Sequence, residues 1–164
     1  YTVAGEISAI AAADLNQDGQ PDLVVTTGEP ASLVVLLGKG DGTFGASVIY
    51  SNSLLDTYGS QLAIADFNGD GKLDLALTNS SANEIDVLSG NGDGTFVSPP
   101  QVYSGGEGAG AIGVLDANGD GRPDIAVVGG AFLTVMINRG DGSFPRATLY
   151  PVPPLALRAD NGRL

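Results

Sequence analysis

The 164-residue chain contains no cysteine, no histidine and no tryptophan. Without cysteine it has no disulfide framework and no thiolate chemistry. Without histidine it lacks the commonest general base and the usual ligand of transition metals. The remaining acids outside the clusters described below are scattered, so we expect no enzyme activity housed in this chain.

Basic residues are also scarce. Seven lysines and arginines stand against 19 aspartates and glutamates, which gives a net charge of −12. A surface this acidic, with no basic patch in the sequence, repels polyanions such as nucleic acid and anionic membranes. No apolar run approaches the ~20 residues that a membrane-spanning helix needs. We therefore expect no nucleic-acid partner and no membrane insertion.

A nine-residue pattern occurs three times, starting at Asp14, Asp66 and Asp116. Each copy has oxygen-bearing side chains at positions 1, 3, 5 and 9 and a glycine at position 6. Alternating oxygens around a sharp glycine turn suit a hard cation such as Ca²⁺, and the residue after the glycine can add its backbone carbonyl. The pattern predicts three calcium loops.

Two alternatives bear on these loops. An EF-hand needs flanking helices and a glutamate at position 12, but position 12 is Val25, Leu77 or Val127 inside an apolar run. A metal-free set of turns is also compatible with Asp, Asn and Gly. However, nine clustered carboxylates without a cation would repel one another, which favours calcium.

The loops belong to a longer repeat. Their starting aspartates are 52 and 50 residues apart, and each loop is followed by a second motif and then by a tyrosine. The second motif spans residues 38–44, 90–96 and 139–144, and the tyrosines are Tyr50, Tyr103 and Tyr150. A period near 50 indicates a stacked array or a propeller.

Within each repeat the local pattern predicts four antiparallel strands. The 25 glycines and 9 prolines argue against helices, and short apolar runs flank every loop. The Asp-Gly of the second motif favours a hairpin turn. The predicted strands are 7–13, 61–65 and 111–115 before the loops, 23–27, 75–78 and 125–128 after them, 32–37, 84–88 and 132–137 next, and a last strand ending at each tyrosine. Four strands per repeat predict an all-β fold of β-propeller blades, with a β-sandwich as the alternative.

The combination of Asp-x-Asn-x-Asp-Gly-x-x-Asp with Gly-Asp-Gly-Thr-Phe resembles the FG-GAP/VCBS repeat of integrin α-subunit propellers and many secreted bacterial proteins. The resemblance covers residues 1–150 in three copies. It implies three Ca²⁺ ions bound on the rim of a propeller. The implied ligands are Asp14, Asn16, Asp18, Gln20 and Asp22; Asp66, Asn68, Asp70, Lys72 and Asp74; and Asp116, Asn118, Asp120, Arg122 and Asp124, where Gln20, Lys72 and Arg122 act through their carbonyls.

The domain expected is one repeat domain over 1–164, with blades at about 4–50, 51–103 and 104–150 and a further blade beginning in 151–164. Family propellers usually have seven blades, and three cannot close a ring of four to eight. The apolar end faces would then recruit partners. We expect a partial propeller or self-association through the exposed blade edges, most simply as a two-fold dimer of six blades.

The function expected is a non-catalytic, calcium-binding recognition or adhesion scaffold in an exported protein, at a cell surface, in a bacterial periplasm or outside the cell. The alternatives are a carbohydrate-binding lectin module with pockets between blades, or an accessory segment of a larger secreted polysaccharide-active enzyme. The ligand is a protein or a glycan. Tyr58, which has no counterpart in the other repeats, is a candidate ligand contact, whereas Arg139-Gly140-Asp141 is expected to be part of a hairpin turn.

Overall fold

The computed structural model describes residues 3, 5–28, 31–50 and 61–152. Tyr58 and the expected start of a further blade after residue 152 lie outside the described residues. The described part of the chain is all-β, and no helix in it is long and apolar enough to cross a membrane.

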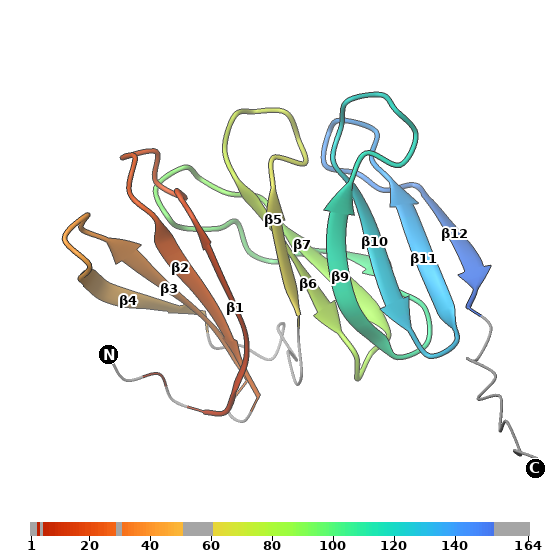
Figure 1. The fold of residues 1–164 in the computed structure, drawn as a ribbon, viewed down its shortest axis with the longest axis horizontal. Helices are drawn as coiled ribbons and strands as arrows, with labels where there is room; N and C mark the ends of the chain where they lie inside the picture. Colours follow the sequence, from red (N-terminus) through yellow and green to blue (C-terminus); the bar gives the residue numbers. More distant parts are fainter. Residues whose placement is uncertain (1–2, 4, 29–30, 51–60, 153–164) are drawn as a thin grey trace, which may run out of the picture.

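The strands form three four-stranded antiparallel sheets, each of which follows the chain order (Figure 1). The first sheet contains β1 (Ile7–Ala13), β2 (Asp22–Thr27), β3 (Ser32–Gly38) and β4 (Phe44–Tyr50). The second contains β5 (Leu62–Ala65), β6 (Asp74–Asn79), β7 (Glu84–Leu88) and β8 (Gln101–Ser104). The third contains β9 (Ala109–Leu115), β10 (Asp124–Gly129), β11 (Phe132–Ile137) and β12 (Arg146–Pro151).

The sheets stand in a row, with the first strands β1, β5 and β9 next to one another (Figure 1). These strands are rich in alanine and glycine (ISAIAAA, LAIA and AGAIGVL), and the small side chains allow this close approach. The predicted all-β fold is confirmed: the three sheets are consistent with propeller blades. Within the described residues the row does not close into a ring.

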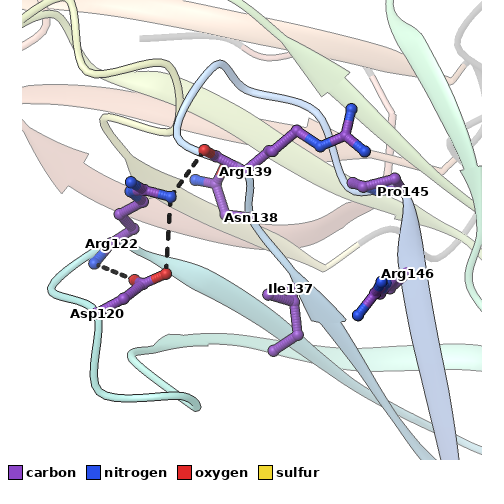
Figure 2. Close-up of a pocket in the computed structure, with 7 residues that line it drawn as sticks. All are labelled: Asp120, Arg122, Ile137, Asn138, Arg139, Pro145 and Arg146. Atoms are coloured by element: carbon purple, nitrogen blue, oxygen red, sulfur yellow. Dashed lines mark hydrogen bonds and ion pairs between the residues drawn. The ribbon is translucent and has the colours of Figure 1, made fainter.

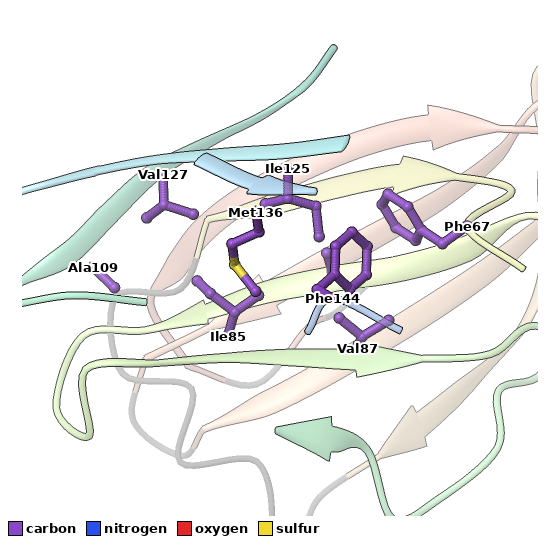
Figure 3. Close-up of a cluster of buried hydrophobic side chains, with 9 residues drawn as sticks. Phe67, Ile85, Val87, Ala109, Ile125, Val127, Met136 and Phe144 are labelled. Carbon is purple, nitrogen blue, oxygen red and sulfur yellow. The ribbon is translucent and has the colours of Figure 1, made fainter. Parts of the chain in front are cut away.

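The core lies between the sheets because the middle strands are apolar on both faces. We call the cluster between the first and second sheets the first junction and that between the second and third sheets the second junction. The first junction buries Leu15, Val24, Leu33, Val35, Leu75, Leu77, Leu88 and Phe96. The second buries Phe67, Ala76, Ile85, Val87, Ala109, Ile125, Val127, Met136 and Phe144 (Figure 3).

The second repeat departs from the other two in its last strand. A single bridge joins Gly90 to Phe96, and β8 begins at Gln101 after two prolines, Pro99 and Pro100. Proline has no N–H to donate to a strand ladder, so pairing is interrupted there. The hairpin turn expected before β8 therefore leads into a shorter strand than in the other sheets.

Candidate calcium loops and the contacts between repeats

Each predicted calcium loop joins the first two strands of its sheet, and the three loops lie along one edge of the row (Figure 1). The second loop is held by bonds from backbone N–H groups to its own side chains. Asp66 Oδ1 accepts from Gly69 N at 2.7 Å, and its Oδ2 accepts from Gly71 N at 2.9 Å. Asn68 Oδ1 accepts from Asp70 N at 2.8 Å. These bonds gather the side-chain oxygens into a tight turn.

The third loop repeats this arrangement, with Asp116 accepting from Gly119 N and Gly121 N at 2.8 Å each. In addition, Asn118 Nδ2 donates to Asp120 Oδ2 at 2.9 Å. This hydrogen bond, together with that from Arg122 N, holds the pKa of Asp120 below its ordinary value. Asp120 is therefore ionised at neutral pH, which is the state that a calcium ligand requires.

The first loop differs at position 4, where Gln17 replaces the glycines of the other two loops. Gln17 adopts φ 61°, in the left-handed region, where Gly69 has φ 74°. This backbone geometry is uncommon for a residue with a side chain. The Gln17 side chain reaches the neighbouring loop, where its Nε2 donates to Gly71 O at 2.7 Å. The first two loops are thus linked directly.

The aspartates at position 9 have a structural role that the sequence analysis missed. Asp74 is 1% exposed; its Oδ2 accepts from Phe67 N at 2.9 Å and its Oδ1 from Gly90 N at 2.8 Å. Burial raises the pKa of Asp74 above its ordinary value. Asp22 and Asp124 make the same pair of bonds in their repeats. Each ties its loop to the start of the following hairpin turn.

This geometry bears on the predicted metal sites. Among the described residues, no group of three or more acidic side chains is placed together to hold a metal ion. The position-9 carboxylates accept from backbone N–H groups at the starts of the loop and of the hairpin turn, and the oxygens at positions 1 and 3 accept from N–H groups within the loop. These are hard oxygen donors of the kind that Ca²⁺ takes, and a carboxylate oxygen that accepts one N–H retains a second lone pair. The donors thus fit Ca²⁺, and the fifteen-residue assignment stays a prediction.

The first and second loops each accept a hydrogen bond from the hairpin turn of the next sheet. Gly94 N donates to Leu15 O at 3.3 Å, and Gly142 N donates to Phe67 O at 3.0 Å. Leu15 and Phe67 occupy position 2 of their loops and are 3% and 1% exposed. An apolar side chain inside an otherwise polar loop was the sequence signal for this contact.

The repeated phenylalanines and tyrosines complete the same contact. Phe96 N donates to the Tyr50 hydroxyl at 2.8 Å, and the two rings meet edge to face at 6.3 Å. Phe144 packs edge to face on Phe67 at 5.6 Å and on Tyr103 at 5.4 Å. The second-motif phenylalanine therefore lies against the previous sheet's tyrosine at both junctions. Figure 3 shows Phe144 beside Phe67 in the second junction.

The Arg139-Gly140-Asp141 tripeptide forms part of the third hairpin turn, as predicted. Asp141 Oδ1 accepts from the backbone and the hydroxyl of Ser143, and these bonds lower its pKa. Asp41 and Asp93 are bonded in the same way to Thr43 and Thr95. The aspartate is therefore a turn residue in all three repeats.

Two pockets border the third loop. The first, which we call the junction pocket, has a volume of about 260 Å³ and lies between the second and third loops. It is lined by Asp66, Phe67, Gly69, Gly121, Arg122, Pro123, Asn138 and Gly140. Asn138 is held by its Nδ2, which donates to Phe67 O at 2.8 Å and to Pro123 O at 2.9 Å. A preformed hollow with a carboxylate, a guanidinium and backbone amides can bind a small polar ligand.

The second pocket, which we call the arginine pocket, has a volume of about 270 Å³ (Figure 2). It is lined by Asp120, Arg122, Ile137, Asn138, Arg139, Pro145 and Arg146. Arg122 Nη1 donates to Arg139 O at 2.8 Å and lies 3.7 Å from Asp120 Oδ2. Three of the chain's seven basic residues thus gather at this pocket.

Comparison with known proteins agrees with these repeats. A family model described as FG-GAP-like repeat matches residues 14–77, 66–127 and 116–162. A solved structure of a lectin from Agrocybe aegerita, described as specifically recognising non-reducing terminal N-acetylglucosamine, is similar to the chain at 27% sequence identity with a TM-score of 0.61. The similarity covers 87% of this chain and 38% of the lectin, so the chain spans less than half of the lectin's length. No curated protein sequence matches the chain significantly.

Proposed function

The chain belongs to the FG-GAP-like repeat family, and on this basis we propose that it is a non-catalytic, calcium-stabilised propeller segment that binds carbohydrate. The observation that carries this proposal is the likeness to a lectin for terminal N-acetylglucosamine over 87% of the chain. It favours the lectin alternative over a general adhesion scaffold with a protein ligand. The lectin is longer than this chain, so its sugar specificity enters here as a hypothesis.

The junction pocket is the candidate saccharide site. It offers the Asp66 carboxylate and the Arg122 guanidinium, both of which can bond sugar hydroxyls, beside the Asn138 amide. Phe67 is buried, so its ring is not available as a stacking platform, and recognition would depend on hydrogen bonds. The junction pocket lies between two repeats, which is where the carbohydrate-binding alternative places its ligand pockets.

Calcium would act on this site through the loops. Asp66 and Gly69 belong to the second loop and Gly121 and Arg122 to the third, so both loops line the junction pocket. A Ca²⁺ ion in each loop would restrain the backbone that carries these groups and offset the repulsion between the loop aspartates. Extracellular modules can use calcium loops of weak, sub-millimolar to millimolar affinity, so an extracellular or periplasmic location is part of the same proposal. An accessory segment of a larger carbohydrate-active protein would use the site in the same way.

The test is a glycan array in 1 mM Ca²⁺, followed by calorimetry with N-acetylglucosamine. We expect binding that disappears in EDTA and falls at least tenfold in Arg122→Gln. Arg146→Gln is the matched control, because it removes the same charge outside the junction pocket. A folded protein that binds no saccharide on the array would overturn the carbohydrate assignment, and equal losses in the two variants would overturn the site.

A further inference from the structure

The two junctions differ in how neighbouring loops meet. At the first junction the Gln17 side chain, at position 4 of its loop, reaches the second loop, where its Nε2 donates to the Gly71 carbonyl at 2.7 Å. This hydrogen bond joins position 4 of one loop to position 6 of the next. At the second junction Gly69 and Gly121 hold these two positions. Gly69 has no side chain, so the Gly121 carbonyl receives no such bond from the second loop.

The space without this side chain belongs to the junction pocket, because Gly69 and Gly121 both line it. A β-carbon at Gly69 would lie 3.6 Å from Gly140 O, which is an ordinary contact, so the backbone leaves room for a side chain there. Gln17 at φ 61° and Gly69 at φ 74° also have similar backbone conformations. The junction pocket therefore includes the counterpart of the place that the Gln17 side chain takes at the first junction.

The Gln17 side chain also indicates which chemistry suits this place, because it ends in a carboxamide, an N–H donor beside a carbonyl acceptor. The Gly121 carbonyl is not one of the predicted calcium ligands, so an ion in the third loop would leave it available as an acceptor. Arg122, the next residue, donates to Arg139 O through Nη1 (Figure 2). A guanidinium has five N–H donors, so others remain for a ligand carbonyl. This acceptor and this donor together suit an amide group.

We propose that the junction pocket binds the acetamido group of an N-acetylated sugar, whose N–H donates to the Gly121 carbonyl as Gln17 Nε2 does to Gly71 O. Position 4 of the loop then decides which junction binds: a glycine leaves the subsite free, and a glutamine fills it. The inference rests on the proposed function and deepens it. It names the chemical group of the saccharide that is recognised, and it places binding at the second junction and not at the first.

Calorimetry in 1 mM Ca²⁺ with N-acetylglucosamine and with glucose tests the recognised group, since glucose carries a hydroxyl in place of the acetamido group. We expect one N-acetylglucosamine bound per chain, and glucose bound at least tenfold more weakly, because it lacks the amide that pairs with Gly121 and Arg122. Equal affinities for the two sugars would overturn the acetamido subsite while leaving the proposed function in place. A chain that binds no saccharide at all would overturn the proposed function itself.

Gly69→Gln tests the role of position 4, because the new side chain should fill the subsite as Gln17 does at the first junction. We expect its affinity for N-acetylglucosamine to fall at least tenfold. Gly119→Gln is the matched control: Gly119 has φ 77°, does not line the junction pocket, and a β-carbon there would meet no atom within 4 Å. It carries the same backbone strain and should bind as the parent does. Equal losses in the two variants would trace the effect to the strain and overturn the proposal.

Gln17→Gly is the converse variant, and it places at φ 61° a residue that adopts this conformation readily. The first junction has Asp14 and Lys72 where the second has Asp66 and Arg122, so it retains a carboxylate and a cation for the sugar. Removal of the Gln17 side chain should free the Gly71 carbonyl and raise the calorimetric count from one N-acetylglucosamine per chain to two. A count that stays at one, beside a parent that binds the sugar, would overturn the role of position 4.

Discussion

The second and third loops have the same sequence pattern and nearly the same internal hydrogen bonds, but their surroundings differ. Phe67 is 1% exposed, and its carbonyl accepts from Gly142 N and Asn138 Nδ2. Ala117, at the same position of the third loop, is exposed. The loop shape is therefore a local property, whereas the burial of the loop is supplied by the next sheet. We therefore separate two contributions to stability: the proposed cation binding, which would act in all three loops, and turn docking, which the described residues show at the first and second loops.

The largest expected effect tests the local contribution. A site with a dissociation constant near 10 µM in 1 mM Ca²⁺ would stabilise the fold by ~2.7 kcal/mol, and three sites by ~8 kcal/mol, which is comparable to the stability of a whole domain. We expect EDTA to lower the melting temperature by more than ten degrees, measured by circular dichroism, and acid to act similarly because the ligands must be ionised. Calorimetry should count three ions. An unchanged melting temperature in EDTA would contradict the calcium assignment. A count of two ions would mean that a loop binds calcium only where the hairpin turn of the next sheet packs on it.

The next effect tests the docking contribution. Phe67→Ala removes a buried ring that packs on Phe144, and such truncations cost about 3–5 kcal/mol. Ala117→Phe places the same ring on the uncovered loop, where we expect a change within about 0.5 kcal/mol in the monomer. Urea unfolding at low protein concentration measures both. Equal effects at the two positions would show that the third loop is covered as well.

A third prediction concerns a buried carboxylate beside the first junction. Asp86 in β7 is 2% exposed, and its Oδ2 has no hydrogen-bond partner among the described residues. Burial, with a smaller effect of Glu84, raises the pKa of Asp86 to about 6. Its cross-strand partner is Leu77 of the first junction. In the first sheet the matching position is Val34, opposite Val25, and in the third it is Thr134, opposite Val127.

Between the ordinary value of 3.8 and about 6, the folded state holds a proton at Asp86 that the unfolded state releases. The free energy of unfolding should therefore fall as the pH rises through this window, by up to roughly 3 kcal/mol. Asp86→Val should remove this dependence and raise stability at pH 7. Melting curves of the two proteins from pH 4 to 7, with saturating calcium, measure the difference. A variant less stable than the parent at pH 7 would mean that the carboxylate is paired.

A fourth effect compares the loops through their ligands. Asp70→Ala and Asp120→Ala should each remove one of three calcium ions, a loss near ~2.7 kcal/mol under the same assumptions. We expect the Asp70 variant to lose more stability, because the second loop also supports the third turn through Phe67. Calcium titration and thermal melting of the two variants give the comparison. If either variant lost two ions, the sites would be coupled.

The sequence was sufficient for the strands and turns because the signals are local. The apolar run 7–13 is β1, and the Asp-Gly at 41–42 lies in the turn before β4. The assignment of the position-9 aspartates as metal ligands stays a prediction, but the sequence analysis missed a second role: Asp74 accepts hydrogen bonds from Phe67 N and Gly90 N. That role depends on bringing together residues 16 apart across two strands, which a loop pattern does not encode. The burial of Leu15 and Phe67 was missed for the same reason, because the hairpin turn that packs on them belongs to the next repeat.

The smallest effect concerns the repeated tyrosines, which the sequence could not tell apart. Tyr50 accepts a hydrogen bond from Phe96 N at 2.8 Å across the first junction, whereas Tyr150, its counterpart in β12, is 51% exposed. Tyr50→Phe leaves the Phe96 N–H without this acceptor, which should cost about 1 kcal/mol. Tyr150→Phe should change nothing measurable in the monomer. Chemical denaturation of both variants measures the free energy of unfolding. Equal losses of stability would mean that Tyr150 also has a hydrogen-bond partner, whereas a loss at Tyr50 alone would show that the repeated tyrosine stabilises the fold only through its contact with the turn of the next sheet.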